Sequence, residues 1–368
     1  MNFAEFDAKL RCVPDVLTSN SGVAVKNKKD FDRRRRELRE VLQSEEYGRI
    51  PNKPDHFSVT VTNIDKSFCA GKAPLLTLKL TVEVGGCEFS FPVYSVIPKT
   101  VGKCPAFIHI NFTPDVPDRY LPSEEIASRG FAVFSFCYND VTRDDDNFKD
   151  GLAKLLVPQK RCGDSPGKIA LWAWAAMRVM DYVQTLDGID LDNVAVIGHS
   201  RLGKTALVAG AFDERFKYVI SNNSGCCGAA ILRKKTGENL AVLAAVRHYW
   251  FCPNLSKYIV NEDVLPLDQN FLLALVAPRH LLIGSSEEDT WADPESEFIA
   301  AHVTSEVYEK IYGIPGLCHN GKMPHADTVL DGGNICYHIR SGGHYLSRDD
   351  WNVYMNYIDK IRLSHNSK

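Results

Sequence analysis

A three-layer αβα sandwich around a mostly parallel sheet, with antiparallel strands at its N-terminal end, is the fold class that three observations predict. The chain has 368 residues and is 45% hydrophobic, which is enough for one large core. Strand-like segments 56–64, 75–84 and 88–98 come first, and Gly85-Gly86 makes a hairpin turn between the last two. From residue 104 onward, short apolar strands alternate with helices, as in a parallel sheet covered on both faces.

The segment before these strands predicts a helical wrap around a single larger domain. Residues 31–44 have the spacing of an amphipathic helix. Four consecutive arginines at 33–36 lie within it, but neighbouring acidic residues neutralise them, so a solvated helix face is favoured over a binding patch. We therefore expect an N-terminal wrap over residues 1–54 and one catalytic domain over residues 55–368.

The alternating part of the chain supplies the parallel strands and their covering helices. Apolar strands are predicted at 104–112, 131–140, 194–200, 218–225 and 279–289. Helices are predicted at 122–130, 168–186 and 204–213, the first ending at Gly130. An antiparallel start followed by strand–helix units is a common layout for an α/β-hydrolase sheet.

Composition excludes several classes of protein. A net charge of −3 and a pI near 6.4 argue against a nucleic-acid binder and a basic membrane-surface protein. No segment approaches 18 uninterrupted apolar residues, and residues 1–20 lack a signal peptide pattern, so a cytoplasmic location is expected unless a leader was removed. Eleven cysteines without a C-x-x-C pair favour buried thiols over disulfides or a zinc site.

One stretch fits two incompatible motifs. Residues 198–205 read G-H-S-R-L-G-K-T, which satisfies the phosphate-binding P-loop, with Lys204 as its lysine. The same stretch places Ser200 between a strand and a helix, as in the elbow that presents a nucleophilic serine. No later strand ends in the aspartate that a P-loop enzyme needs for magnesium, and the loop lacks internal glycines. The rest of the chain therefore favours the serine elbow.

A serine hydrolase of this fold needs an acid and then a histidine later in the chain. Asp289 follows the apolar strand in "HLLIGSSEED". His344 lies near the C-terminus, directly after two glycines, in "YHIRSGGHYL". Rival acids are Glu287, Glu288 and Asp293, of which Asp293 precedes Pro294 and is typical of a helix cap. Among the rival histidines, His338 is expected to be packed in an apolar strand and His199 to be structural or pocket-lining, while His280 precedes a core strand.

The chain resembles the glucuronoyl esterases, carbohydrate esterase family 15. The elbow of that family carries G-x-S-R-x-G-K, matched by Gly198, Ser200, Arg201, Gly203 and Lys204. Further likenesses are "NNSGCCGAA", "KKTGENL", "EEDTWADPESEF" and "CYHIRSGGHYLSRDDW". The standard G-x-S-x-G elbow would have glycine at position 202, where this chain has Leu202.

The resemblance implies roles for individual residues. Arg201 would add its guanidinium to the oxyanion site, and Asp289 matches the acid that some members place in this loop. Other members have a glutamate just after the strand that follows the elbow, but residues 221–225 here read S-N-N-S-G without an acid. Lys204, Glu238 and Trp291 match positions that hold a glucuronate sugar. The alternatives are a solvated helix lysine for Lys204 and a core aromatic for Trp291.

The expected function is hydrolysis of a (4-O-methyl) glucuronic acid ester from xylan- or lignin-derived carbohydrate, with Ser200 as nucleophile and His344 as base. No metal or cofactor is expected, and the partner would be a small-molecule or oligosaccharide uronate ester. Two alternatives stay open. One is a deacetylase of acetylated xylo-oligosaccharides that uses the same three residues, and the other is a catalytically silent carbohydrate-binding relative.

Overall fold

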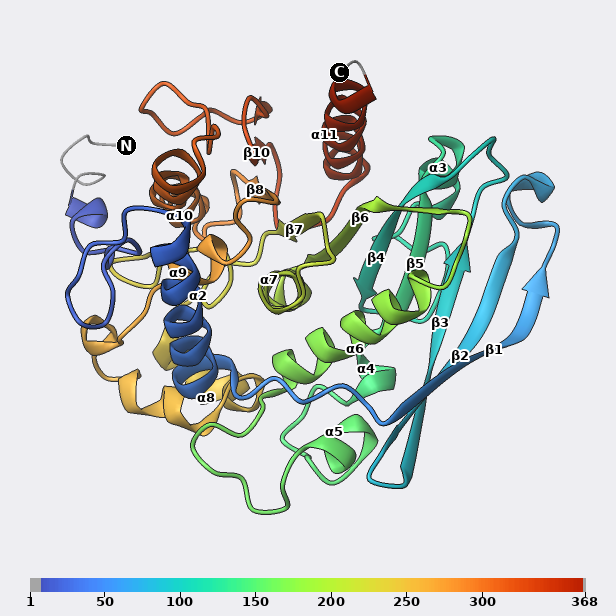
Figure 1. The fold of residues 1–368 in the computed structure, drawn as a ribbon, viewed down its shortest axis with the longest axis horizontal. Helices are drawn as coiled ribbons and strands as arrows, with labels where there is room; N and C mark the ends of the chain where they lie inside the picture. The colour runs from blue at the N-terminus through green and yellow to red at the C-terminus, as the bar shows by residue number, and fades with distance from the viewer. Residues whose placement is uncertain (1–7, 367–368) are drawn as a thin grey trace.

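A ten-stranded sheet forms the centre of the computed structural model, which describes residues 8–366 (Figure 1). The strands lie in the order β1-β2-β3-β5-β4-β6-β7-β8-β10-β9. Their bounds are β1 His56–Asp65, β2 Leu75–Val84, β3 Cys87–Val96, β4 Cys104–Asn111, β5 Ala132–Cys137, β6 Ile189–His199, β7 Tyr218–Asn222, β8 His280–Ser286, β9 Thr328–Leu330 and β10 Ile335–Arg340.

The sheet has the predicted mixture of strand directions. β1, β2 and β3 pair antiparallel, and β3 also joins β5 antiparallel. The six strands from β5 to β10 in sheet order run parallel, and β9 closes the far edge antiparallel to β10. This arrangement confirms the predicted fold class. Three predicted strands were too long. The strand predicted at 131–140 ends at Cys137, because Tyr138–Val141 turns into the short helix α4. Those predicted at 218–225 and 279–289 end at Asn222 and Ser286.

Helices cover both faces of the sheet because its central strands are apolar on both sides. In β6, Val194 and Val196 pack into the larger hydrophobic cluster, whereas Ala195 and Ile197 face the smaller one. Figure 1 shows α6 and α7 on one side of the sheet, with α3 and α11 on the other. Four of the central strands, β4, β5, β7 and β8, are buried along their whole length. The carboxyl ends of the parallel strands are the places where side chains can reach a shared site.

The helices have the following bounds. The α-helices are α2 Lys28–Leu42, α3 Ser123–Ser128, α4 Tyr138–Val141, α5 Gly151–Leu156, α6 Lys168–Val183, α7 Arg201–Phe212, α8 Leu240–Arg247, α9 Gln269–Ala274, α10 Pro294–Glu306 and α11 Arg348–Asn366. Shorter turns of 3₁₀ or π type are η1 Gln43–Tyr47, η2 Phe68–Gly71, η3 His248–Trp250, η4 Pro253–Tyr258, η5 Glu262–Val264 and η6 Val307–Tyr312.

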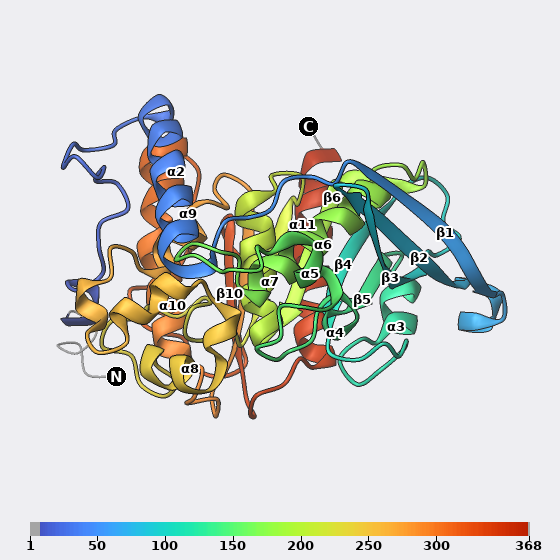
Figure 2. The same ribbon diagram turned by 90° about the horizontal axis from the view of Figure 1, so that it is seen from below.

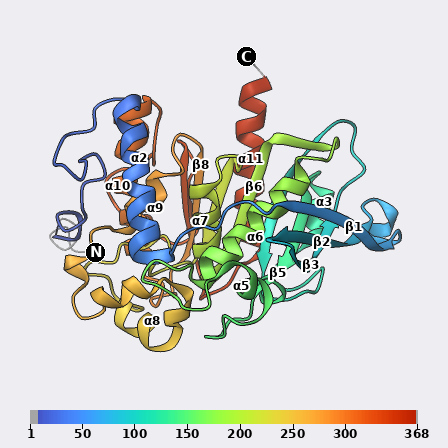
Figure 3. The same ribbon diagram turned by 60° about the horizontal axis from the view of Figure 1, so that its bottom comes forward.

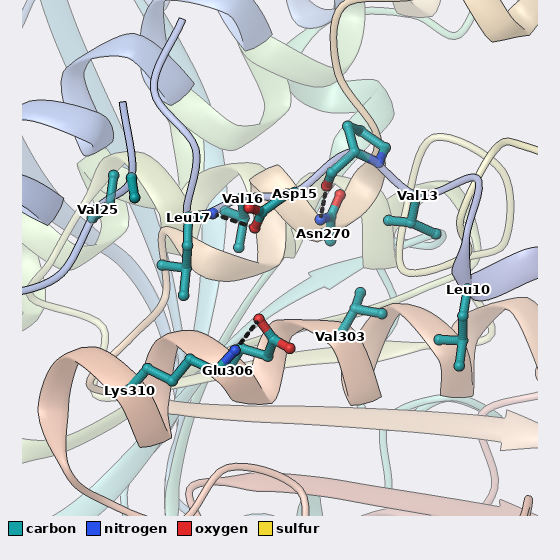
Figure 4. Close-up of a pocket in the computed structure, with 12 residues that line it drawn as sticks. Leu10, Val13, Asp15, Val16, Leu17, Val25, Asn270, Val303, Glu306 and Lys310 are labelled. Atoms are coloured by element: carbon teal, nitrogen blue, oxygen red, sulfur yellow. Dashed lines mark hydrogen bonds and ion pairs between the residues drawn. The ribbon is translucent and has the colours of Figure 1, made fainter. Parts of the chain in front are cut away.

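The N-terminal segment lies against the outer helices before it reaches the sheet. Helix α2 runs beside α9 and α10, and an extended stretch then leads to β1 (Figures 2 and 3). Phe31, Leu38 and Leu42 of α2 belong to the main hydrophobic cluster, so α2 shares the core of the sheet. Figure 4 shows a cleft that residues 10–25 leave over α9 and α10, where the Asn270 side-chain amide donates to the Pro14 carbonyl.

Candidate active site

Ser200 occupies a strained turn between β6 and α7. Its backbone angles are φ 58° and ψ −126°, which a non-glycine residue adopts only where the surrounding structure imposes them. The Ser200 amide donates to the Asn222 carbonyl of the neighbouring strand at 2.8 Å, which fixes the turn. Two residues earlier, a Cβ at Gly198 would stand 2.0 Å from the Leu202 carbonyl oxygen, so only glycine fits there.

The structure explains why this elbow has leucine at position 202 and its glycine at position 203. Leu202 is fully buried in the main hydrophobic cluster, where the first turn of α7 meets the core. Gly203 is instead the position where α7 packs closely against the end of β7 and the residues after it. A Cβ at Gly203 would lie 3.1 Å from side-chain atoms of both Ser221 and Ser224. The elbow of this chain therefore keeps its tight packing with the glycine one position later.

Lys204 is committed to protein partners and not to an open phosphate loop. Its Nζ is buried and donates to the Ser224 carbonyl at 2.6 Å, and it lies 3.3 Å from a carboxylate oxygen of Glu238. The Ser200 amide already has an acceptor, so the loop does not present a row of free N–H groups to a phosphate. The structure thus favours the serine elbow over the P-loop.

The acid and the histidine that the sequence predicted are brought together. Asp289 lies three residues beyond β8 and accepts a hydrogen bond from His344 Nδ1 at 2.6 Å. The Asp289 side chain is buried, whereas 42% of the His344 side chain is exposed, so the imidazole can reach a ligand. His199, which precedes Ser200, has its ring centroid 4.5 Å from that of His344, which places the imidazole beside the elbow.

Asn223 is a site residue that the sequence did not single out. It follows β7 at the position where other family members were expected to have a glutamate, and it has a left-handed φ of 46°. Its Nδ2 donates to Asp289 Oδ2 at 2.9 Å and to Ser286 Oγ at 3.0 Å. The Asn223 side chain therefore supports the Asp289 carboxylate, which is predicted to serve as the acid. An amide after a strand has no signature in a single sequence.

Electrostatics keep Asp289 ionised and His199 neutral. Burial by itself would raise the pKa of Asp289, but the hydrogen bond and charge of His344 and the Asn223 amide outweigh it and hold the pKa below its ordinary value. Burial, reinforced by the nearby His344, lowers the pKa of His199 to about 3. His199 Nδ1 lies 2.7 Å from Asn222 Oδ1, which is compatible with the structural or pocket-lining role expected for it.

The rival residues are occupied elsewhere. His338 is buried and lies 2.7 Å from Asp350, which fits the packed role expected for it, and the buried His280 lies 2.9 Å from the Tyr357 hydroxyl. Asp293 caps α10, accepting from the Ser296 amide at 3.2 Å. Glu287 and Glu288 are exposed. Their backbone amides donate hydrogen bonds to the carbonyls of Arg340 and Gly342, just before His344.

Arg201 begins α7, directly after the nucleophile. Its guanidinium forms a short ion pair with Asp144 and lies 4.9 Å from the centroid of the Trp250 ring. The backbone N–H of a first-turn residue has no intrahelical acceptor, so it can face a developing oxyanion. Both features are compatible with the oxyanion role expected for Arg201, which stays a prediction. Asp144 and Trp250 had not been predicted.

The three residues expected to hold a sugar come from helix α7, which carries Lys204, and from two touching loops, which carry Glu238 and Trp291. The Glu238 amide donates to the Trp291 carbonyl at 3.0 Å. Gly237 permits this approach, because a Cβ there would stand 2.4 Å from the Thr290 carbonyl oxygen. The Trp291 side chain is 53% exposed, so it is not a core aromatic and can cover a ligand. Lys204 lies 3.3 Å from Glu238, and the sugar-binding role of the three residues stays a prediction.

Residues 8–366 contain neither a cluster of metal-binding side chains nor a membrane-spanning helix. No three histidine, cysteine, aspartate or glutamate side chains gather there in a way suited to a metal ion. No helix in that range combines the length and the apolar character needed to cross a bilayer. All eleven cysteines are free, and six of them are buried.

Comparison with known proteins places the chain. Residues 80–312 match the family described as "Glucuronyl esterase, fungi". A carbohydrate esterase from an unknown prokaryotic organism is 30% identical over 97% of this chain and 91% of its own length. A 4-O-methyl-glucuronoyl methylesterase of Neurospora crassa is 30% identical over 82% of this chain and 73% of its own.

Solved structures agree with the sequence comparisons. The glucuronoyl esterase from Solibacter usitatus superposes with a TM-score of 0.86 at 30% identity, covering 94% of this chain and 97% of that one. A promiscuous esterase of carbohydrate esterase family 15 from a marine bacterial metagenome has a TM-score of 0.85 at 30% identity, covering 94% and 96%. The matched family, the sequence identity over most of the chain and the shared fold together show that this chain belongs to the glucuronoyl esterases of carbohydrate esterase family 15.

Proposed function

We propose that this chain cleaves esters of glucuronic acid, including its 4-O-methyl form, through an acyl-enzyme on Ser200. Ester cleavage at a glucuronic acid carboxyl is the activity after which the matched family and the Neurospora crassa relative are named. The single observation that carries the mechanism is the 2.6 Å contact between His344 Nδ1 and Asp289, beside a strained Ser200. This arrangement supports a serine nucleophile with a histidine base.

In the first half of the reaction, Ser200 Oγ attacks the ester carbonyl while His344 Nε2 takes the hydroxyl proton. Asp289 holds the imidazole through Nδ1 and stabilises the imidazolium that forms. The carbonyl oxygen becomes an oxyanion, for which the Arg201 backbone amide and guanidinium are the expected donors. The C–O bond to the alcohol then breaks, and His344 returns the proton to the departing alkoxide.

In the second half, His344 takes a proton from water, whose oxygen attacks the acyl carbon. Collapse of the second tetrahedral intermediate breaks the bond between the acyl carbon and Ser200 Oγ and releases glucuronic acid. His344 returns the proton to Oγ, which restores the Ser200 hydroxyl. Lys204 and Glu238 offer a cation and a carboxylate for sugar hydroxyls, and the exposed indole of Trp291 offers a flat surface for the ring. We infer a small-molecule or oligosaccharide uronate ester derived from xylan or lignin as substrate. A cytoplasmic location stays a prediction, which fractionation of the native host would test.

The test is hydrolysis of methyl and benzyl D-glucuronate beside p-nitrophenyl acetate, by the wild type and by Ser200→Ala. Turnover of the glucuronates that Ser200→Ala abolishes is the expected result. Turnover of the acetate alone would keep the catalytic residues but replace the proposed substrate with an acetyl ester. No turnover of any substrate, together with no labelling by a fluorophosphonate, would leave the binding-only alternative.

A further inference from the structure

Three consecutive aspartates, Asp144 to Asp146, follow α4 and point to different partners. Asp145 lies 3.8 Å from the Lys168 ammonium, and Asp146 lies 3.1 Å from His248. Both of these aspartates are exposed, with about half of each side chain open to water. Asp144 differs, since only 13% of its side chain is exposed and it turns toward Arg201. Of these three aspartates, Asp144 is therefore the one that contacts a residue of the candidate active site.

The Asp144 carboxylate is held from several sides. Trp250 Nε1 donates to Oδ1 at 2.6 Å, and the Tyr138 hydroxyl lies 3.4 Å from Oδ2. The backbone carbonyl of Asp144 also accepts from the Tyr249 hydroxyl at 2.9 Å. Such a carboxylate has little freedom to rotate, so its short ion pair with Arg201 Nη1 fixes the direction of the guanidinium.

The guanidinium of Arg201 is also confined by aromatic rings. Its central carbon lies 4.9 Å from the Trp250 ring centroid and 5.7 Å from that of Phe112. Arg201 Nε is shielded from solvent and has no hydrogen-bond acceptor among residues 8–366. The side chain thus keeps unused donor capacity directly beside the nucleophile. A donor stabilises an oxyanion most when it is already oriented, because no free energy is then spent on ordering it.

We propose that Asp144 is a positioning residue that holds the Arg201 guanidinium in place for the oxyanion, with Trp250 orienting the Asp144 carboxylate. This inference rests on the proposed function, since it assumes that Arg201 serves an ester-hydrolysing Ser200. Asp144 acts through Arg201 and needs no contact with the substrate. Its removal should therefore slow the chemical step and leave substrate binding nearly unchanged.

The experiment is a double-mutant cycle on methyl D-glucuronate with Asp144→Asn, Arg201→Ala and the combined variant. We expect Asp144→Asn to lower kcat by about 10- to 100-fold with KM changed less than about twofold, which is part of the loss caused by removing a whole oxyanion donor. In the Arg201→Ala background, the same change should leave kcat equal or higher, because an unpaired carboxylate would repel the oxyanion. Trp250→Phe should give a smaller loss that also disappears in that background.

Asp146→Asn is the matched control, since it removes a neighbouring carboxylate that lies outside this network, and it should keep wild-type kcat. An equal fall from Asp144→Asn in both backgrounds would overturn the proposal, because Asp144 would then act on structure and not through Arg201. Wild-type kcat in Asp144→Asn would overturn it as well. Wild-type kcat in Arg201→Ala would remove the oxyanion role itself, whereas the Ser200→Ala comparison tests the hydrolase activity separately.

Discussion

Glu297 makes the stability of this protein depend on pH in a direction that can be calculated. The residue lies on α10 with its side chain fully buried. Its carboxylate accepts from the Gly225 amide at 2.9 Å and from Ser285 Oγ at 2.5 Å, and so joins the ends of β7 and β8 beneath the site. Burial raises the pKa of Glu297 from its ordinary value of 4.5 to about 7, and the two hydrogen bonds offset this only in part.

The sign of the effect follows from the two pKa values. Below about pH 4.5 the glutamic acid is protonated in both the folded and the unfolded chain, so it causes no pH dependence. As the pH rises toward about 7, the unfolded chain releases this proton and the folded chain keeps it, so the free energy of unfolding falls. At 1.36 kcal/mol for each pH unit between 4.5 and about 7, the loss amounts to about 3 kcal/mol.

Glu297→Gln removes this loss, because glutamine can accept from Gly225 and donate to Ser285 without titrating. We expect the variant to gain about 3 kcal/mol relative to the wild type between about pH 4 and pH 8, measured by urea unfolding at each pH. Its hydrolytic activity should be kept. Glu306→Gln, an exposed change on the same helix, is the control and should show no such gain. A constant difference between Glu297→Gln and the wild type across this pH range would refute the reasoning. Glu46, whose pKa burial also raises to about 7, supplies a similar pH dependence that should persist in the variant.

Three further predictions concern the site and the elbow. Asn223→Ala should lower kcat on methyl D-glucuronate about tenfold without raising KM, because the catalytic carboxylate loses a hydrogen bond; steady-state kinetics would show a changed KM instead if the amide bound substrate. Lys204→Met should raise KM for methyl D-glucuronate about tenfold and spare p-nitrophenyl acetate, and equal losses on both esters would contradict a sugar-binding role. Gly198→Ala should destabilise the fold by at least about 3 kcal/mol in thermal unfolding, since its Cβ meets a backbone carbonyl at 2.0 Å, whereas Gly188→Ala has open space and should be tolerated.

The fold was predictable because its strands carry their pattern locally. The run at 75–84 matches β2 residue for residue, since alternation and the glycine pair after it mark both the strand and its end. The run at 131–140 was less reliable. Its last three residues, beginning at Tyr138, leave the sheet for α4, and nothing in the apolar run signals that Cys137 is the last residue to pair. Tertiary pairing decided that boundary.

The three residues predicted to be catalytic come together for a different reason, which also explains why Asp144 and Trp250 were missed. Ser200, Asp289 and His344 each follow a strand, and strand order brings their ends to one edge of the sheet. Asp144 lies instead in the irregular segment between α4 and α5, and Trp250 ends the short 3₁₀ turn η3. No periodicity in the sequence predicts that these two residues meet Arg201.

The contacts of His344, Arg201 and Lys204 indicate that the site needs little rearrangement when a substrate binds. His344 is held by Asp289, and Arg201 is held by Asp144, so the groups expected to act on the ester are oriented before a substrate arrives. Lys204 differs, because its contact with the Ser224 carbonyl is short at 2.6 Å and its contact with Glu238 is longer at 3.3 Å. A sugar hydroxyl that donates to Glu238 and accepts from Lys204 therefore replaces only the weaker of these two contacts. Sugar binding at this pair would then leave the lysine fixed to the backbone next to the elbow, and the geometry around the nucleophile would stay unchanged.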